Sequence, residues 1–184
     1  GPAIWFENVK GSSFSSASNV FGSLDRSRFI FRDTLQSVRK IVQLKKDPFK
    51  ALRNPFGHML AFKALPLNQT FSRPLFNNID LSGLPQIKSW SNDGGPYILL
   101  PQVYTEDIEL PGVMHSNLGC YRIQMAGNSY IKNKEMGLHY QLHRGIGVHQ
   151  KKCNDLGIPL KVSIFVGGPP AHTLAAVMPL PEGI

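Results

Sequence analysis

Apolar and polar positions alternate over short stretches in the second half of the chain, between clusters of Gly, Pro, Asn and Asp. Alternation with a period of two predicts β-strands, and the residues between the stretches favour turns. We therefore expect strands over 97–104, 119–126, 136–143 and 160–166. Several strands at this spacing are typical of an antiparallel barrel or sandwich.

Helical spacing occurs elsewhere. From Ser27 to about Leu44, apolar residues recur at intervals of three and four with Arg and Lys between them, which predicts one amphipathic helix. Glycine and proline bound two further short helices, over 148–156 and 171–178. Residues 3–6 are expected to form a short buried strand. The first part of the chain therefore looks α/β, with too few strands to close a sheet alone.

Two of the expected strands each present one polar face. The residues on these faces are Cys120, Arg122 and Gln124, and His139, Gln141 and His143. A sheet with one solvated face would show the same pattern, so alternation alone leaves a structural and a binding role equally open. The neighbouring Arg144 and Gly145 favour a binding site. Histidine can ligate a metal, arginine can hold a phosphate or carboxylate, and glycine lets a ligand approach the backbone.

Composition limits the classes of protein to consider. At 184 residues the chain fits one domain or two small ones. No apolar run approaches the roughly 18 residues of a membrane span, and no signal peptide opens the chain. Cys120 and Cys153 lie far apart without CxxC spacing, which argues against a disulfide framework or a zinc site. A reducing, cytoplasmic setting is therefore expected.

Charge is unevenly distributed. Residues 1–75 hold twelve Lys and Arg against four Asp and Glu, whereas residues 76–184 hold eight of each. The excess concentrates between Arg26 and Arg53, and a basic segment of this kind can bind nucleic acid or another anion. No nucleic-acid motif accompanies it, so a solvated helix face is the favoured interpretation. An anion-binding interaction protein that uses residues 26–53 is one alternative function.

Five motifs follow one another along the chain: GPAIWFENVKG at 1–11, SWSNDGGPYI at 89–98, NLGCYR at 117–122, HRG at 143–145 and PLPEG at 179–183. In this order they resemble the motifs of UbiD-type decarboxylases. Their collinear order over nearly the whole chain makes the resemblance specific. Family members are prenylated-flavin-dependent, non-oxidative decarboxylases of aromatic and α,β-unsaturated acids. They extend well beyond both end motifs, so the chain resembles an internal piece of such an enzyme.

The resemblance implies an α+β fold. A partial N-terminal α/β domain would occupy residues 1–76, and a prenylated-FMN-binding split β-barrel of flavin-reductase type, incomplete at its C-terminal end, would occupy residues 77–184. The parent protein would be a carboxy-lyase that reversibly decarboxylates an aromatic or α,β-unsaturated acid with prenylated FMN, Mn²⁺ or Mg²⁺, and K⁺ as a further ion. A flavin prenyltransferase would supply the cofactor, and a homo-oligomer would form through the C-terminal part. A non-catalytic flavin- or metal-binding module is the second alternative.

The resemblance also assigns metal ligands. Asn117 and His143 match two ligand positions of the family, and the third, a Glu shortly after the PLPEG motif, would lie beyond Ile184. Glu182 belongs to the motif itself and is not assigned this role. A flat strand would turn Asn117 and Arg122 to opposite faces, so we expect Asn117 in a turn, with Gly119 supplying the bend.

By the same resemblance Arg122 is the active-site arginine. It would pair with the substrate carboxylate and be held by carboxylates from the C-terminal part, where the proton donor also lies, so residues 1–184 alone are expected to be inactive. The cofactor-contacting positions are Cys120, Tyr121, Arg122, His139, Tyr140, Gln141, Arg144 and Gly145. The remaining histidines, to which we assign structural roles, are His58, His115, His149 and His172.

Overall fold

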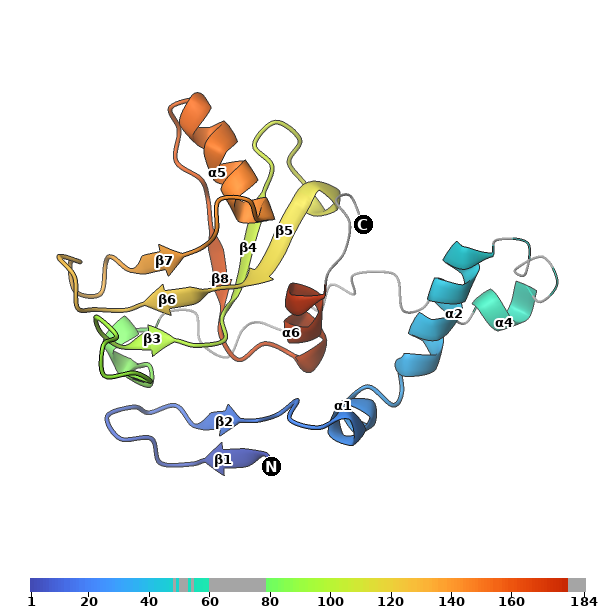
Figure 1. Cartoon of the computed structure of the whole chain (residues 1–184), viewed down its shortest axis with the longest axis horizontal. Helices are drawn as coiled ribbons and strands as arrows, with labels where there is room; N and C mark the ends of the chain where they lie inside the picture. The colour runs from blue at the N-terminus through green and yellow to red at the C-terminus, as the bar shows by residue number, and fades with distance from the viewer. Residues whose placement is uncertain (48, 50–52, 54, 60–78, 179–184) are drawn as a thin grey trace. The chain divides into compact units, whose positions relative to one another are not determined.

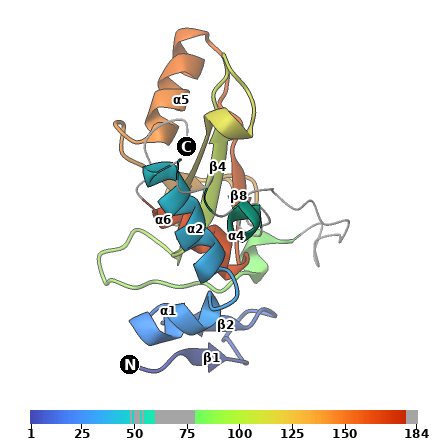
Figure 2. The same cartoon turned by 90° about the vertical axis from the view of Figure 1, so that its right-hand side faces the viewer.

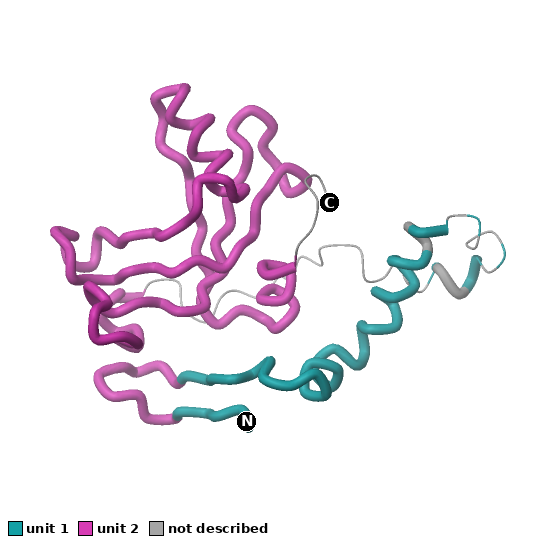
Figure 3. The backbone as a smooth tube through the Cα atoms, in the orientation of Figure 1, with its two compact units in different colours: residues 1–6, 16–78 teal, residues 7–15, 79–184 magenta. Residues whose placement is uncertain are grey.

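The computed structural model describes residues 1–47, 49, 53, 55–59 and 79–178 of the chain. The chain divides into two compact units, one of residues 1–6 and 16–78 and the other of residues 7–15 and 79–184 (Figure 3). The predicted boundary between residues 76 and 77 lies outside the described residues, as does the PLPEG motif at 179–183. The two predicted domains therefore stay a prediction.

The first unit opens with a two-stranded hairpin. Strand β1 (Ile4–Phe6) pairs antiparallel with β2 (Ser16–Ser18). The strand predicted near residues 3–6 is therefore present, but its expected burial is wrong, because Trp5 is 62% exposed. A two-stranded ribbon has no second layer of its own to cover its side chains.

Two helices replace the single helix predicted from Ser27 to Leu44. Helix α1 (Leu24–Ile30) is followed by a turn and then by α2 (Leu35–Lys46). At the interruption, the Arg32 guanidinium lies 4.4 Å from the centre of the Phe29 ring and donates to the Phe29 carbonyl oxygen. This contact satisfies a carbonyl group at the end of α1. A further short helix, α4 (Pro55–Met59), lies beside α2 (Figure 2).

A bent antiparallel ribbon forms the centre of the second unit. The predicted strands over 97–104 and 119–126 each divide in two, giving β3 (Tyr97–Ile98) and β4 (Gln102–Glu106), and β5 (Ser116–Cys120) and β6 (Arg122–Gln124). β3 pairs with β6, and β4 pairs with β5.

The bend has a simple cause in the register. Between the pairs Ile98↔Ile123 and Gln102↔Cys120, the three residues 99–101 of one strand segment face only the two residues 121–122 of the opposite segment. One extra residue on one side of a strand pair is a β-bulge, which bends and twists the ribbon. Pro101 has no N–H to donate to a ladder, so continuous pairing is not possible through this point.

The bend divides the strands between two small sheets (Figure 1). Strand β7 (Gly137–His139) adds to β6 in a sheet of order β3-β6-β7, and β8 (Ser163–Phe165) adds to β4 in a sheet of order β5-β4-β8. The strands predicted over 136–143 and 160–166 are thus present but shorter. The fold is mixed α/β with small sheets, and the split β-barrel of flavin-reductase type, incomplete at its C-terminal end, remains a prediction.

Helices cover both faces of the β5-β4-β8 sheet. On one face, His149 of α5 (Gly145–Asp155) is bonded through Nδ1 to the Thr105 hydroxyl at 2.9 Å. On the other, the Gln102 amide donates to the Thr173 hydroxyl of α6 (Pro170–Val177) at 3.2 Å. Gln102 and Thr105 are three positions apart on β4, so they point to opposite faces. Both predicted helices are confirmed, and none of the described helices is long and apolar enough to cross a membrane.

A small apolar core connects the two sheets with α5. Ile98 and Ile123 are paired across β3 and β6, and Val103 of β4 packs with Ile146 of α5 in the same cluster. Ile123, Val103 and Ile146 are fully buried, and each such burial stabilises the fold by about 1.5–3 kcal/mol. The described residues also form two 3₁₀ turns, η2 (Leu81–Gly83), whose Leu81 packs against this core, and η3 (Val113–His115). The core thus fixes the bend of the ribbon in place.

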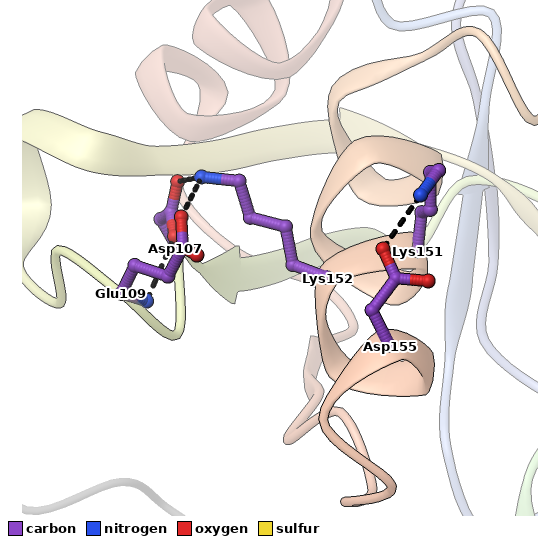
Figure 4. Close-up of polar contacts among 5 residues, drawn as sticks. All are labelled: Asp107, Glu109, Lys151, Lys152 and Asp155. Carbon is purple, nitrogen blue, oxygen red and sulfur yellow. Dashed lines mark hydrogen bonds and ion pairs between the residues drawn. The ribbon is translucent and has the colours of Figure 1, made fainter.

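An ion-pair cluster ties the loop between β4 and β5 to α5 (Figure 4). Lys152 Nζ lies 2.6 Å from Asp107 Oδ2 and 2.8 Å from Glu109 Oε2. The Glu109 N–H donates to the other Asp107 oxygen at 2.9 Å. The hydrogen bond from Lys152 lowers the pKa of Asp107, and its two carboxylate partners raise the pKa of Lys152.

We predict that Lys152→Met lowers the melting temperature of the purified protein by about 2 °C near neutral pH, because it leaves the partly buried Asp107 without its cation. Lys151→Met is the matched control on the same helix, since the Lys151–Asp155 pair is 75% and 62% exposed (Figure 4). It should change the melting temperature by less than about 1 °C. Equal shifts in the two variants would contradict the assignment.

The pH dependence follows from the two pKa directions. Asp107, with a lowered pKa, contributes stability above its ordinary value of 3.8 and loses it as the pH falls through the lowered folded value. Lys152, with a raised pKa, contributes fully below its ordinary value of 10.5 and loses the contribution as the pH rises through the raised value. The difference between Lys152→Met and the parent should therefore be largest between about pH 5 and 9 and shrink in acid.

Candidate functional site

A cavity of about 540 Å³ lies where the ribbon passes from one sheet to the other. Its lining residues come from the bend, from the end of β7 and the segment after it, and from the end of α6. They are Gly119, Cys120, Tyr121, Arg122, His139, Tyr140, Gln141, Arg144, Ala176 and Val177. Seven of the eight residues predicted to contact a cofactor are therefore brought to one cavity, the exception being Gly145.

Arg122 is held on two sides at this cavity. Its Nη2 donates to Asp93 Oδ1 at 2.9 Å, and its guanidinium carbon lies 4.0 Å from the centre of the Tyr97 ring. The side chain is nevertheless 44% exposed. A guanidinium has five N–H donors in a fixed plane, so one ion pair leaves others free for a ligand.

Arg122 has a carboxylate partner within this chain, Asp93, that we did not predict from the sequence. The carboxylates expected from beyond Ile184 stay a prediction. The hydrogen bond from Arg122 holds the pKa of Asp93 below its usual range, so this carboxylate is ionised at neutral pH. Asp93 lies in the SWSNDGGPYI motif. An acidic residue directly before a Gly-Gly turn and a strand is the sequence feature from which this partner of Arg122 could have been predicted.

Close backbone packing positions the Asp93 loop. A Cβ on Gly95 would lie 1.9 Å from the carbonyl oxygen of Ala126, so only glycine fits where this loop crosses the end of β6. Within the loop, the Trp90 N–H donates to Asp93 Oδ2 at 3.1 Å, and the Asp93 N–H donates to the Trp90 carbonyl oxygen at 3.0 Å. The carboxylate therefore reaches Arg122 from a well-fixed turn.

One face of the β3-β6-β7 sheet carries the groups around Arg122. Arg122 pairs with His139 across β6 and β7, and the rings of His139 and Tyr97 meet edge to face at 5.5 Å. Gln124 shares this face but is only 2% exposed, and its amide oxygen accepts from the Tyr97 hydroxyl at 3.3 Å. The predicted common face is wrong for Cys120, which ends β5 on the far side of the bend.

Asn117 lies in a strand. It belongs to β5 and pairs with Thr105, so the expected turn at Asn117 with a bend at Gly119 is wrong. The bend comes later, at Tyr121, whose hydroxyl accepts from the Asn117 amide at 3.4 Å. A Cβ on Gly145 would lie 2.5 Å from Asn117 Oδ1, so these two residues lie close together at the start of α5. Gly145 therefore packs against Asn117 instead of lining the cavity.

His143 also departs from its expected place. Strand β7 ends at His139, so His139, Gln141 and His143 do not share one strand face, and the NLGCYR and HRG motifs do not lie on neighbouring strands. His143 is exposed in the turn before α5 and does not line the cavity. Across the described part of the chain, no three His, Cys, Asp or Glu side chains form a group that could hold a metal. The metal-ligand roles of Asn117 and His143 therefore stay predictions.

The electrostatic character of the cavity is cationic. Arg122 and Arg144 both line it, and among its described lining residues none is acidic. Arg144 is the N-cap residue of α5, so it lies at the positive end of that helix, and its Nε donates to Gln141 Oε1 at 3.3 Å. Burial raises the pKa of the Cys120 thiol, which is therefore uncharged at neutral pH. The arrangement suits an anionic ligand.

Comparisons with known proteins identify the family. Residues 66–184 match the model of the 3-octaprenyl-4-hydroxybenzoate carboxy-lyase Rift-related domain (UbiD), and residues 1–45 match that of the N-terminal domain of the same carboxy-lyase. One subunit of a 4-hydroxybenzoate decarboxylase from Chlamydia pneumoniae is 33% identical over 197 residues, which cover 100% of this chain and 31% of the relative. An uncharacterised protein of Chlamydia trachomatis serovar D is 36% identical over 198 residues, which cover 100% of this chain and 32% of that relative.

Solved structures share the fold at low sequence identity. The vanillic acid decarboxylase of Sedimentibacter hydroxybenzoicus, in its closed form, superposes with a TM-score of 0.73 at 23% identity over 99% of this chain and 37% of its own. An evolved dimeric form of the UbiD-class enzyme HmfF from Pelotomaculum thermopropionicum, in complex with prFMN, superposes with a TM-score of 0.66 at 21% identity. The match covers 99% of this chain and 39% of the HmfF chain.

The chain spans about a third of the length of the curated relatives it matches. The Rift-related domain model covers more than half of the chain, and the N-terminal model covers most of the remainder. The chain therefore belongs to the UbiD family of carboxy-lyases.

Proposed function

We propose that the protein containing this chain reversibly decarboxylates an aromatic or α,β-unsaturated acid, using prenylated FMN and a divalent metal. The observation that carries the proposal is the cavity at the ribbon bend, which collects Arg122 and six further predicted cofactor-contacting residues. Because the chain spans about a third of its relatives, the activity is assigned to the whole protein.

The cavity suits a flavin nucleotide. Its volume of about 540 Å³ lies within the roughly 300–1,000 Å³ typical of small-molecule sites. Arg144, at the positive end of α5, is suited to bind the phosphate of the flavin nucleotide. The uncharged thiol of Cys120 is suited to contact the apolar flavin ring. The residues that would hold prenylated FMN are Cys120, Tyr121, Arg122, His139, Tyr140, Gln141 and Arg144, with Gly145 supporting Asn117 at the start of α5. We further propose that the two three-stranded sheets are part of a split β-barrel of flavin-reductase type.

A metal would lie at the start of α5. Asn117 packs against Gly145, and His143 precedes Gly145 by two residues, so both residues lie near the start of α5. An amide oxygen and an imidazole suit Mn²⁺ or Mg²⁺ when a carboxylate completes the set. K⁺ is proposed as a further ion. The described residues supply no carboxylate cluster here, so the remaining ligands are assigned to the rest of the protein.

The residues of this chain would act mainly by orientation. When bound, the prenylated flavin supplies the electron sink that the reaction needs. Arg122 would bind the substrate carboxylate through its remaining N–H groups, while Asp93 and Tyr97 fix the plane of the guanidinium. Ala176 and Val177 of α6 give the cavity an apolar wall.

Partners follow from the same proposal. The substrate is a small carboxylic acid, a flavin prenyltransferase supplies the cofactor, and the protein forms a homo-oligomer in the cytoplasm. Nucleic-acid or other anion binding by residues 26–53 is less favoured, because Arg26, Arg28 and Arg32 already make local contacts. A visible absorbance spectrum separates a flavin protein from an anion-binding protein, and carbon dioxide release separates an enzyme from a non-catalytic flavin module.

We predict that Arg122→Ala lowers kcat/KM at least about 100-fold in the full-length protein, because the carboxylate loses its oriented partner. The melting temperature should fall by no more than about 4 °C, since Asp93 keeps its bond from Trp90. Arg32→Ala is the matched control, as Arg32 also lies over an aromatic ring and pairs with Asp33. Unfolding or aggregation of Arg122→Ala, with or without cofactor, would favour a purely structural role.

We also predict that Asn117→Ala and His143→Ala each lower manganese and flavin occupancy together. The physical reason is that a metal beside the flavin phosphate neutralises its charge, so losing a ligand weakens both. Elemental analysis and visible absorbance of the full-length protein measure the two occupancies. His115→Ala is the control for His143, because both histidines are exposed. Unchanged occupancy of both groups in either variant would remove that residue from the metal site.

A further inference from the structure

Asp93 accepts a hydrogen bond from one edge of the Arg122 guanidinium, and the Asp93 side chain is itself held in place by its loop. Its side chain is only 9% exposed, and both of its oxygens are used, Oδ1 by Arg122 and Oδ2 by the Trp90 N–H. The Gly95 backbone packing fixes the loop that carries it. This is unlike a pair of long, mobile surface side chains, whose ion pairs are weak because both partners must be ordered.

The charge balance at Arg122 bears directly on decarboxylation. The substrate begins with a full negative charge on its carboxylate, and that charge leaves the carboxylate as the carbon–carbon bond breaks. An arginine with its whole positive charge available would therefore stabilise the substrate more than the transition state, and such binding does not speed the chemical step. An arginine that is held in place but partly neutralised would still orient the carboxylate. It would stabilise the bound substrate less, so it would raise the activation barrier less.

We propose that Asp93 is a positioning residue with two effects on Arg122: it fixes the guanidinium over the Tyr97 ring, and it offsets the positive charge offered to the substrate carboxylate. The inference rests on the proposed decarboxylase function and adds a residue to the machinery of that site. Asp93 does not line the cavity, so it acts through Arg122 alone.

The test is Asp93→Asn in the full-length protein. Asparagine has the same shape and keeps a carbonyl oxygen for the Trp90 N–H, but its amide nitrogen then faces Arg122. The variant therefore removes both the negative charge and the hydrogen bond that fixes the guanidinium. Titration calorimetry with 4-hydroxybenzoate, vanillate and uncharged 4-hydroxybenzamide measures binding, and carbon dioxide release from the loaded enzyme measures turnover. We expect the acids to bind about fivefold more tightly, the amide to bind unchanged, and kcat to fall about tenfold.

Asp107→Asn is the matched control. Asp107 also pairs with a cation, Lys152, accepts a backbone N–H from Glu109, and has a side chain that is 14% exposed, yet it lies away from the cavity. This variant should lower the melting temperature without changing acid affinity or kcat. In an Arg122→Ala background, Asp93→Asn should have no further effect on acid affinity, because the residue through which it acts is gone.

The outcomes separate the two proposals. Acid affinity and kcat that stay unchanged in Asp93→Asn, while the parent protein turns over acid, would overturn the role of Asp93 and leave the decarboxylase function intact. Weaker acid binding by Asp93→Asn would also overturn the charge-offset role. A parent protein that binds acid but releases no carbon dioxide from any aromatic or α,β-unsaturated acid would overturn the proposed function, while the change in acid affinity would still be measurable. Absence of binding of every such acid by the parent would overturn both.

Discussion

One extra residue in a β-ribbon decides where the functional groups of this protein lie. Residues 99–101 face residues 121–122, and the resulting bulge turns the ribbon from the β5-β4-β8 sheet into the β3-β6-β7 sheet. Without the bulge, Cys120 and Arg122 would lie on one face of a continuous strand. With it, the corner opens a cavity, and Gly119 to Arg122 line it in succession.

The arginine at this corner owes its orientation to three different interactions. A hydrogen-bonded ion pair with Asp93 fixes one edge, the Tyr97 ring supports one face, and pairing of β6 with β7 sets the backbone. The Asp93 carboxylate comes from the loop before β3, and the Tyr97 ring comes from β3 itself. The packing of Gly95 holds this segment against the end of β6. The geometry of one side chain therefore depends on backbone contacts between segments almost thirty residues apart in sequence.

Helix α5 connects the stability of the fold with the shape of the site. Ile146 belongs to the core, and His149 is bonded to Thr105 of the central strand. Lys152, one turn further along, holds the β4–β5 loop through Asp107. The first turn of the same helix packs Gly145 against Asn117 and follows Arg144 at the cavity. A change that loosens the far end of α5 therefore acts on the same helix whose first turn supports the site.

The sequence by itself determined the family, the two helices after residue 144, the approximate strand positions and most of the cavity residues, because these depend on local periodicity and on collinear motifs. Tertiary structure decided the rest. Asn117 proved to lie in a strand and His143 in a turn, since strand ends depend on pairing partners that periodicity does not reveal. The pairing of Asp93 with Arg122 was equally hidden, because it arises only when the bulge and the Gly95 packing bring residues 29 positions apart into contact.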